Sequence, residues 1–207
     1  YYIFTMRKNA AGENQVYYSI YDRKLNGGKG GVSIKNQFLS PAPSAERFGV
    51  AVSGGDYYWL QTQDADSTIL RTFKVSKAGI GAPIESVANS PVKGPSASSH
   101  FSRDGKVLAI AYVSPPSNQV DIYDFDVATG KTTFRYRIPL ANSPYGVEFS
   151  ADGKIVYAST NVGPNAQIWQ YSIASLDSSA MQRSKSLLWS GPGKIGALQG
   201  DPSSGSI

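Results

Sequence analysis

One short stretch occurs twice in this chain, and the repeat constrains the fold more than any other feature. Residues 101–111 read Phe-Ser-Arg-Asp-Gly-Lys-Val-Leu-Ala-Ile-Ala, and residues 149–159 read Phe-Ser-Ala-Asp-Gly-Lys-Ile-Val-Tyr-Ala-Ser. The copies lie 48 positions apart (149 − 101 = 48). Each places Asp-Gly between two apolar runs, and glycine accepts the positive φ that a tight turn between strands needs. The stretch therefore predicts a β-hairpin that recurs in a repeat.

The length of the repeat predicts the architecture. A period of about 40–50 residues built from short strands is typical of a β-propeller, where each repeat is one four-stranded antiparallel blade. We therefore expect an all-β fold, a β-propeller of about four to five blades in one domain over residues 1–207. Turn residues and apolar runs place the expected blades at 1–40, 46–89, 95–140 and 143–190.

The two ends of the chain break the blade pattern. The first blade shows only three strand-like runs, which read as a second, third and fourth strand. Residues 194–199 read as the first strand of a further or a closing blade. Two interpretations follow: a segment of a longer propeller, which we favour, or a four-bladed ring that its last strand closes. Residues 174–183 are expected to contain a short helical turn.

Composition excludes several classes of site. The chain has 207 residues and no cysteine, which rules out disulfides, thiolate metal sites and cysteine nucleophiles. No run of about 18 apolar residues occurs, so we expect no membrane span. The N-terminus does not read as a signal peptide, and a secreted precursor would carry its signal upstream.

The net charge of +5 is spread thinly along the chain. Arg7-Lys8 and Arg23-Lys24 are the only adjacent basic pairs. Nucleic-acid binding needs a basic cluster or stripe, so we expect no nucleic-acid partner.

The repeats resemble a known group of proteins. Residues 144–159 and their counterpart around Phe101 look like the YVTN and WD-like propeller repeats of bacterial surface proteins. Residues 1–5, 17–22 and 25–30, together with 195–199, resemble the N-terminal propeller of gliding-motility-associated proteins exported by the type IX secretion system. This resemblance implies an extracellular or cell-surface location and further blades or PKD-type modules in a longer chain. It carries over no catalytic residue.

His100 is the only histidine in the chain, and it offers the main route to an enzyme. It aligns with Glu148 of the next repeat and Ala51 of the previous one, which places it on a first strand. We interpret it as a strand residue that faces the channel or a neighbouring blade. A Ser-His-Asp set is recognised by geometry, which the sequence does not provide.

Paired carboxylates occur at Asp64 with Asp66 and at Asp124 with Asp126. Such pairs can ligate Ca²⁺, but neither matches a twelve-residue calcium loop. We interpret the first as a polar loop and the second as an outward strand face, and we expect no metal and no cofactor. The Ser-x-Asp-Gly-Lys turns differ from the sialidase Asp box, which has a residue between Asp and Gly.

Residues at the starts of first strands are the candidate ligand-binding positions. Phe48 and Tyr145 occupy these starts, near the loops that join blades, where an aromatic ring can stack on a sugar or peptide. The full set of candidate ligand-binding residues is Arg47, Phe48, His100, Tyr145 and Glu148. The loops expected to form the contact surface are 41–47, 64–67, 90–96, 114–119, 141–145 and 161–165.

These observations favour a non-enzymatic scaffold that presents loops to a protein or glycan partner. The alternative is a lactonase-type propeller hydrolase, since those propellers share the Ser-x-Asp-Gly-Lys hairpin. Its acidic or histidine ligands would converge on the central channel, where Glu46, His100 and Glu148 are the candidates.

Overall fold

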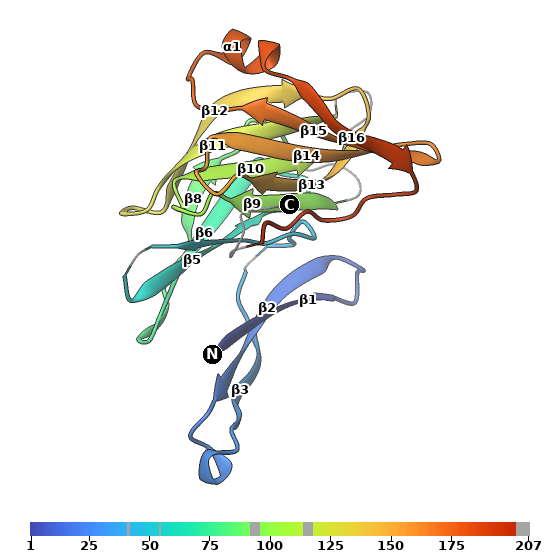
Figure 1. Ribbon diagram of the computed structural model, residues 1–207. Helices are drawn as coiled ribbons and strands as arrows, with labels where there is room; N and C mark the ends of the chain where they lie inside the picture. Colours follow the sequence, from blue (N-terminus) through green and yellow to red (C-terminus); the bar gives the residue numbers. More distant parts are fainter. Residues whose placement is uncertain (41, 54, 92–95, 114–117, 202–207) are drawn as a thin grey trace. The chain divides into compact units, whose positions relative to one another are not determined.

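The computed structural model describes residues 1–40, 42–53, 55–91, 96–113 and 118–201. The chain divides into two compact units, Tyr1–Glu46 and Arg47–Ile207, which are described separately. Four antiparallel sheets follow one another along the chain, with very little helix (Figure 1). The prediction of an all-β fold built from small antiparallel blades is therefore confirmed.

The first unit contains the first blade, a three-stranded sheet in the order β1-β2-β3. The glycine-rich loop predicted before β3 contains a short 3₁₀ turn, η1, and Gly27, Gly28 and Gly30 all adopt positive φ there. Side chains on both faces of the sheet are aromatic, including the stacked pair Tyr2 and Phe4. The elements are β1 (Tyr2–Lys8), β2 (Asn14–Asp22), η1 (Asn26–Gly28) and β3 (Gly31–Phe38).

The second unit begins with the second blade, in which β4, β5 and β6 pair in chain order. Its outer strand is split, because β7 and β8 both pair with β6. Pro83 lies between them and lacks the N–H that a continuous ladder would need. The strands are β4 (Gly49–Val52), β5 (Tyr57–Gln63), β6 (Ile69–Ser76), β7 (Gly79–Ile80) and β8 (Ile84–Val87).

The third and fourth blades each have four strands that pair in chain order, and the first strand lies at one edge. The predicted helical turn is present as α1, whose N-terminus is capped by the Asp177 carboxylate. The third blade is β9 (Ser96–Phe101), β10 (Val107–Tyr112), β11 (Gln119–Asp126) and β12 (Lys131–Pro139). The fourth is β13 (Ser143–Phe149), β14 (Ile155–Val162), β15 (Asn165–Ser172), α1 (Ser178–Arg183) and β16 (Ser186–Pro192).

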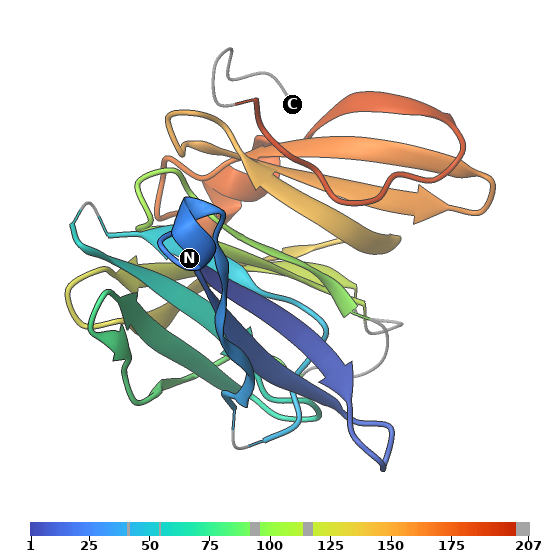
Figure 2. The same cartoon turned by 90° about the horizontal axis from the view of Figure 1, so that it is seen from below.

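Within the second unit, the second, third and fourth blades follow one another face to face (Figures 1 and 2). Small and β-branched side chains fill the space between the third and fourth blades, where Ala109, Ile122 and Val156 are fully buried. Aromatic rings fill the space between the second and third blades. There the Phe125 ring packs edge-on against Phe101 at 4.9 Å and against Trp59 at 6.0 Å.

The repeated hairpin turn owes its shape to its polar residues. In the first copy the Ser102 hydroxyl donates to the Asp104 carboxylate at 2.7 Å, and the same carboxylate accepts the Lys106 N–H at 3.1 Å. The Ser102 Oγ also accepts the Val107 N–H at 3.0 Å. Gly105 has a φ of 71°, in the left-handed region. Every polar residue of the motif therefore bonds within the turn.

The second copy repeats these bonds with nearly the same lengths. Ser150 donates to Asp152 at 2.7 Å, Asp152 accepts the Lys154 N–H at 3.1 Å, and Ser150 Oγ accepts the Ile155 N–H at 3.0 Å. These donors lower the pKa of Asp152 from its ordinary value, the Ser150 hydroxyl most of all. The motif is a structural turn that joins the first two strands of a blade.

Substituting the two turn glycines tests this description. Both adopt positive φ, so alanine at either position is strained by about 1 kcal/mol. A Cβ at Gly105 would also lie 2.9 Å from the carbonyl oxygen of Val52, whereas at Gly153 the nearest atom is the Ser102 Cβ at 3.6 Å. We expect Gly105→Ala to lower the melting temperature more than Gly153→Ala, as measured by calorimetry. Equal decreases in melting temperature would show that Val52 of the second blade does not lie close to the turn at Gly105.

Candidate functional site

The predicted contact loops that belong to the second unit lie, in their described parts, at one end of its sheets. Because neighbouring strands are antiparallel, each blade's first strand begins at the end where its second strand finishes. The described loop residues at this end are 63–68, 88–91, 139–143, 162–165 and 193–195. We call this end the loop face. Residues 41, 92–95 and 114–117 of the predicted contact loops lie outside the described residues.

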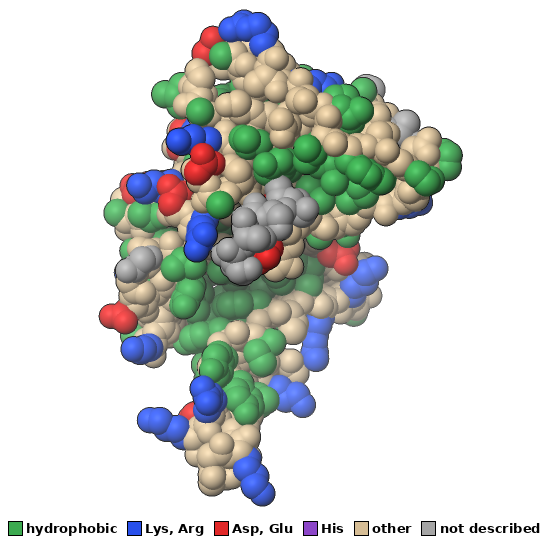
Figure 3. All heavy atoms as spheres, in the orientation of Figure 1, with side chains coloured by type: hydrophobic (Ala, Val, Ile, Leu, Met, Phe, Trp, Pro, Cys, Tyr) green, Lys and Arg blue, Asp and Glu red, His purple; other side chains and the backbone are tan. Residues whose placement is uncertain are grey.

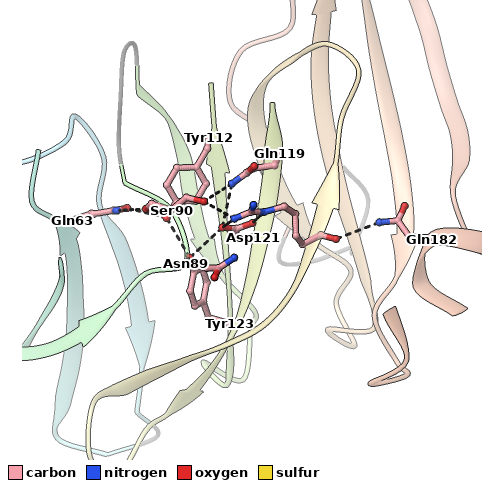
Figure 4. Close-up of polar contacts among 9 residues, drawn as sticks. Gln63, Asn89, Ser90, Tyr112, Gln119, Asp121, Tyr123 and Gln182 are labelled. Carbon is pink, nitrogen blue, oxygen red and sulfur yellow. Dashed lines mark hydrogen bonds and ion pairs between the residues drawn. The ribbon is translucent and has the colours of Figure 1, made fainter. Parts of the chain in front are cut away.

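A set of hydrogen-bonded polar side chains lies beneath the loop face and joins the second blade to the third (Figure 4). Its centre is Asp121 on β11, whose side chain is fully buried. Arg137 on β12 binds both carboxylate oxygens, from Nε at 2.8 Å and from Nη2 at 3.0 Å. Gln119 and the Tyr123 hydroxyl each donate to the same carboxylate at 3.4 Å. We call these residues, with those of the next paragraph, the interblade network.

The interblade network continues into the second blade through Gln63 and Ser90. The Tyr112 hydroxyl donates to Gln63 Oε1 at 3.0 Å, and Gln63 Nε2 donates to the Ser90 carbonyl at 3.0 Å. The Ser90 hydroxyl accepts bonds from Gln119 and Arg137 at 2.7 and 2.5 Å. These contacts fasten the β8–β9 loop to the third blade.

Arg47 is part of this network. Its guanidinium donates to the Ala111 carbonyl at 2.8 Å and to Gln63 Oε1 at 2.7 Å, and it lies over the Tyr112 ring. Only 6% of the residue is exposed. Burial lowers the pKa of Arg47 and raises that of Tyr112. The structure therefore places Arg47, a predicted ligand-binding residue, in contacts between blades.

His100 and Glu148 form a second polar site, on the inner strands β9 and β13. The His100 Nδ1 lies 2.7 Å from Glu148 Oε1. The His100 side chain is 41% exposed and that of Glu148 only 7%. An ionised carboxylate can only accept, so the proton lies on Nδ1 and leaves the lone pair of a neutral ring on Nε2. The sequence left open whether His100 faces the channel or a neighbouring blade, and the structure places its ring against Glu148 of the next blade.

Three donors hold the Glu148 carboxylate. Besides His100, the Phe149 N–H reaches Oε1 at 2.7 Å and the Gly200 N–H reaches Oε2 at 2.8 Å. Burial alone raises the pKa of Glu148, but the bonds from His100 and the two backbone amides outweigh it, so the pKa lies below its ordinary value. Glu148 thus links three consecutive segments at the inner edge: β9, β13 and residues 195–200.

This lowered pKa has a consequence for stability at acid pH. A carboxylate whose folded pKa is depressed stabilises the fold above its unfolded pKa, about 4.5, and that contribution is lost as the pH falls through the folded value. We expect Glu148→Gln to melt below the wild type at neutral pH, and the difference to shrink below about pH 4.5. Melting curves across pH measure it. A difference that stays constant into the acid range would contradict the assignment.

Three predicted positions remain: Tyr145, Phe48 and Glu46. Tyr145 is the third residue of β13, near the loop face, and is 44% exposed, while its carbonyl accepts the Ser98 hydroxyl at 2.9 Å. Phe48 precedes β4 and is half-buried. Glu46 is exposed and belongs to the first unit.

Three of the four carboxylates weighed as calcium ligands, Asp64, Asp124 and Asp126, bond to neighbouring side chains. Arg71 binds both oxygens of Asp64 at 2.8 Å, Arg135 pairs with Asp124, and Asp126 accepts the Thr129 hydroxyl. Among the described residues, no three His, Asp or Glu side chains gather closely enough to hold one metal ion. None of the helices in the described part of the chain is long and apolar enough to cross a membrane.

Sequence reasoning missed the interblade network. Residues 120–126 alternate apolar and acidic side chains, which indicates one buried and one exposed face. In the structure Asp124 and Asp126 are exposed as predicted, but Asp121 is fully buried. The signal for Asp121 is its phase, since at a spacing of two it shares a face with Tyr123 and Phe125 rather than with Asp124 and Asp126; its pairing with Arg137 on β12 depends on the strand register.

Comparison with known proteins supports the fold. No protein-family model matches the chain, and no curated protein matches its sequence. Solved structures do match, at low identity. A candidate 6-phosphogluconolactonase from Bacteroides fragilis aligns with 92% of this chain and 55% of its own, at 16% identity and a TM-score of 0.57. One from Bacteroides uniformis aligns with 91% and 54%, at 12% identity and a TM-score of 0.60.

A structure of a nidogen/laminin complex also matches, over 97% of this chain and 65% of that one, at 10% identity and a TM-score of 0.53. The chain thus spans about half the length of the two Bacteroides structures. At these identities the likeness concerns the fold alone. Together with the four antiparallel sheets, it identifies the architecture of this chain as a β-propeller.

Proposed function

We propose that this propeller is a non-enzymatic scaffold of an exported bacterial cell-surface protein, and that it binds a protein or glycan partner through its loop face. The observation that carries the proposal is the interblade network, which holds the bases of several loops on a rigid body. Asp121, Arg137 and Ser90 are joined there by direct bonds from two blades. Loops positioned by a rigid scaffold are the usual place for binding.

The location and process in this proposal come from the sequence resemblance. The repeats around Phe101 and Phe149 are similar to those of exported bacterial surface proteins, which supports a cell-surface role in adhesion or gliding motility. One fold neighbour is a complex of two proteins, nidogen and laminin. A fold like that of this chain therefore occurs in a protein that binds another protein, which is compatible with the proposed role.

A matched pair of exposed tyrosines tests the loop face. Tyr145 lies near the start of β13, close to the loop face, and 44% of it is exposed. Tyr58 lies near the start of β5, at the opposite end of the sheets, and 53% of it is exposed. A glycan array and a library of surface-protein fragments from a gliding bacterium, both probed with the purified chain, supply the ligand. We expect Tyr145→Ala to weaken binding at least about tenfold and Tyr58→Ala to leave it unchanged. The reverse pattern would refute binding through the loop face.

A lactonase-type hydrolase is the second candidate, and the His100–Glu148 pair favours it. A carboxylate that orients an imidazole, with Nε2 open to solvent, is an arrangement suited to a general base. Two fold neighbours bear the name 6-phosphogluconolactonase. Hydrolysis of 6-phosphogluconolactone and of simple δ-lactones decides between the candidates. The scaffold proposal predicts no turnover above buffer, and turnover that His100→Gln abolishes would establish the hydrolase.

A further inference from the structure

The fourth blade has one face turned away from the third blade, and apolar side chains occupy it. Val156 and Ala158 on β14 point into the core shared with the third blade, so Ile155 and Tyr157 point to the other side. Ile168 on β15 pairs with Ser159, and Trp189 on β16 pairs with Ile168, which places both on this second face. We call it the outward face.

The side chains of the outward face are only partly covered. Ile155, Tyr157 and Ile168 are half-buried, and Trp189 is 42% exposed. Figure 3 shows apolar side chains gathered over the region of β14, β15 and β16. Tryptophan within a strand ordinarily packs between sheets, as Trp59 does with 2% exposure.

The third blade uses the matching positions to bind its neighbour. Ala109 and Val120 are fully buried against the fourth blade. Tyr157 and Ile168 follow them by 48 residues (157 − 109 and 168 − 120), the same interval that separates the two hairpins. The outward face of the fourth blade is therefore the repeat equivalent of a face that another blade covers. Its side chains at the two positions compared are larger, whereas Ser159 and Gln170 stand where the third blade has Ala111 and Ile122.

Residues 195–200 already lie along this face. The Asn161 amide bonds the backbone of Ile195 twice, accepting its N–H at 3.1 Å and donating to its carbonyl at 3.3 Å. The Ser159 hydroxyl donates to the Gly196 carbonyl at 3.2 Å. A Cβ at Gly146 would lie 2.7 Å from that carbonyl, so glycine is what lets the segment lie so close.

The same links join the two preceding inner strands. The Ser98 hydroxyl on β9 donates to the Tyr145 carbonyl and accepts the Val147 N–H, both at 2.9 Å. His100 on β9 binds Glu148, just as Glu148 binds Gly200. Residues 195–200 form no regular strand. They nevertheless contact β13 and its blade through the same kinds of hydrogen bond by which β13 contacts β9.

We propose that the outward face of the fourth blade is the docking face for a further β-sheet blade of the same protein, and that residues 195–200 are the inner strand of that blade. A further blade is the occupant rather than a second copy because a segment of this chain is already seated there by the contacts that join earlier blades. The chain also spans about half the length of the propellers it matches. The inference does not depend on the partner of the loop face.

Replacing Ile168 with aspartate tests the proposal in two forms of the protein. In the chain of 207 residues Ile168 is half-buried, and we expect Ile168→Asp to lower the melting temperature by about 2 °C. In the product of the complete reading frame the same side chain would be buried under the next blade. There we expect a loss of at least about 5 °C. Leu176→Asp, at a residue 77% exposed away from this face, is the control and should change neither form.

Three results would overturn the proposal. The first is an equal loss of melting temperature in both forms. The second is a reading frame that ends at Ile207. The third is a stable dimer, seen in both forms by analytical ultracentrifugation and abolished by Ile168→Asp, since a second copy would then cover the face.

Discussion

Replacing Arg137 with alanine is expected to lower the free energy of unfolding by about 2–3 kcal/mol, less than the about 3–5 kcal/mol for a fully buried ion pair because the Arg137 side chain is 37% exposed. Arg137 binds both oxygens of Asp121, whose side chain has no exposed surface. Its removal leaves a buried carboxylate whose bonds from Gln119 and Tyr123 are long, at 3.4 Å each. Urea unfolding followed by circular dichroism measures the loss as a lower midpoint.

Arg135 is a matched control on the same strand. It pairs with Asp124 on β11; the Arg135 side chain is 15% exposed, and the Asp124 carboxylate, at 51%, is open to solvent, unlike that of Asp121. An ion pair open to solvent contributes about 1 kcal/mol or less, so Arg135→Ala should shift the midpoint only slightly. Adding Asp121→Asn to Arg137→Ala removes the unpaired charge and should recover part of the loss. Equal losses for the two arginines would contradict the buried network.

Truncating Phe125 to alanine is expected to cost about 3–5 kcal/mol, the range for a large aromatic residue removed from a core. Phe125 is 4% exposed and lies between the rings of Phe101 and Trp59. Trp59 comes from β5 of the second blade, whereas Phe125 and Phe101 come from the third. The cavity would therefore open where two blades meet.

The choice of replacement separates cavity formation from other effects. Phe125→Leu keeps most of the apolar volume and should cost about 1.5 kcal/mol or less. Guanidinium unfolding followed by tryptophan fluorescence reports on Trp59 beside the cavity. If alanine and leucine cost the same, the Phe125 ring does not fill the interface as described.

The hairpins could be predicted from the sequence because their determinants are local. Ser102, Asp104 and Gly105 bond or bend within one turn, so the motif carries its own geometry wherever it occurs. Its exact recurrence with Ser150 and Asp152 also supplied the repeat length. That repeat length aligned His100 with Glu148, and the structure brings the two together.

The interblade network could not be predicted, because its contacts join residues far apart in the chain. Arg47 reaches Gln63 and the Ala111 carbonyl, which belong to two different blades. Its position just before a first strand suggested a ligand contact, and no neighbouring residue in the sequence indicated that Arg47 is buried. Asp121 is in phase with Tyr123 and Phe125 on β11, which indicates the buried face, but its partners do not follow from that phase. They depend on the register of β12 and on the packing of one blade on the next.

In this fold the two repeated hairpins belong to neighbouring blades. His100 tests that arrangement most directly, because it is the chain's only histidine and its NMR signals are therefore assigned without ambiguity. Nitrogen-15 NMR of the labelled imidazole, at a pH where the ring is neutral, identifies which nitrogen carries the proton. The 2.7 Å contact from Nδ1 to Glu148 predicts the Nδ1–H form, and Glu148→Ala should return the ring to the Nε2–H form that prevails in water. An Nε2–H ring in the wild type, unaffected by Glu148→Ala, would contradict the packing of β9 beside β13.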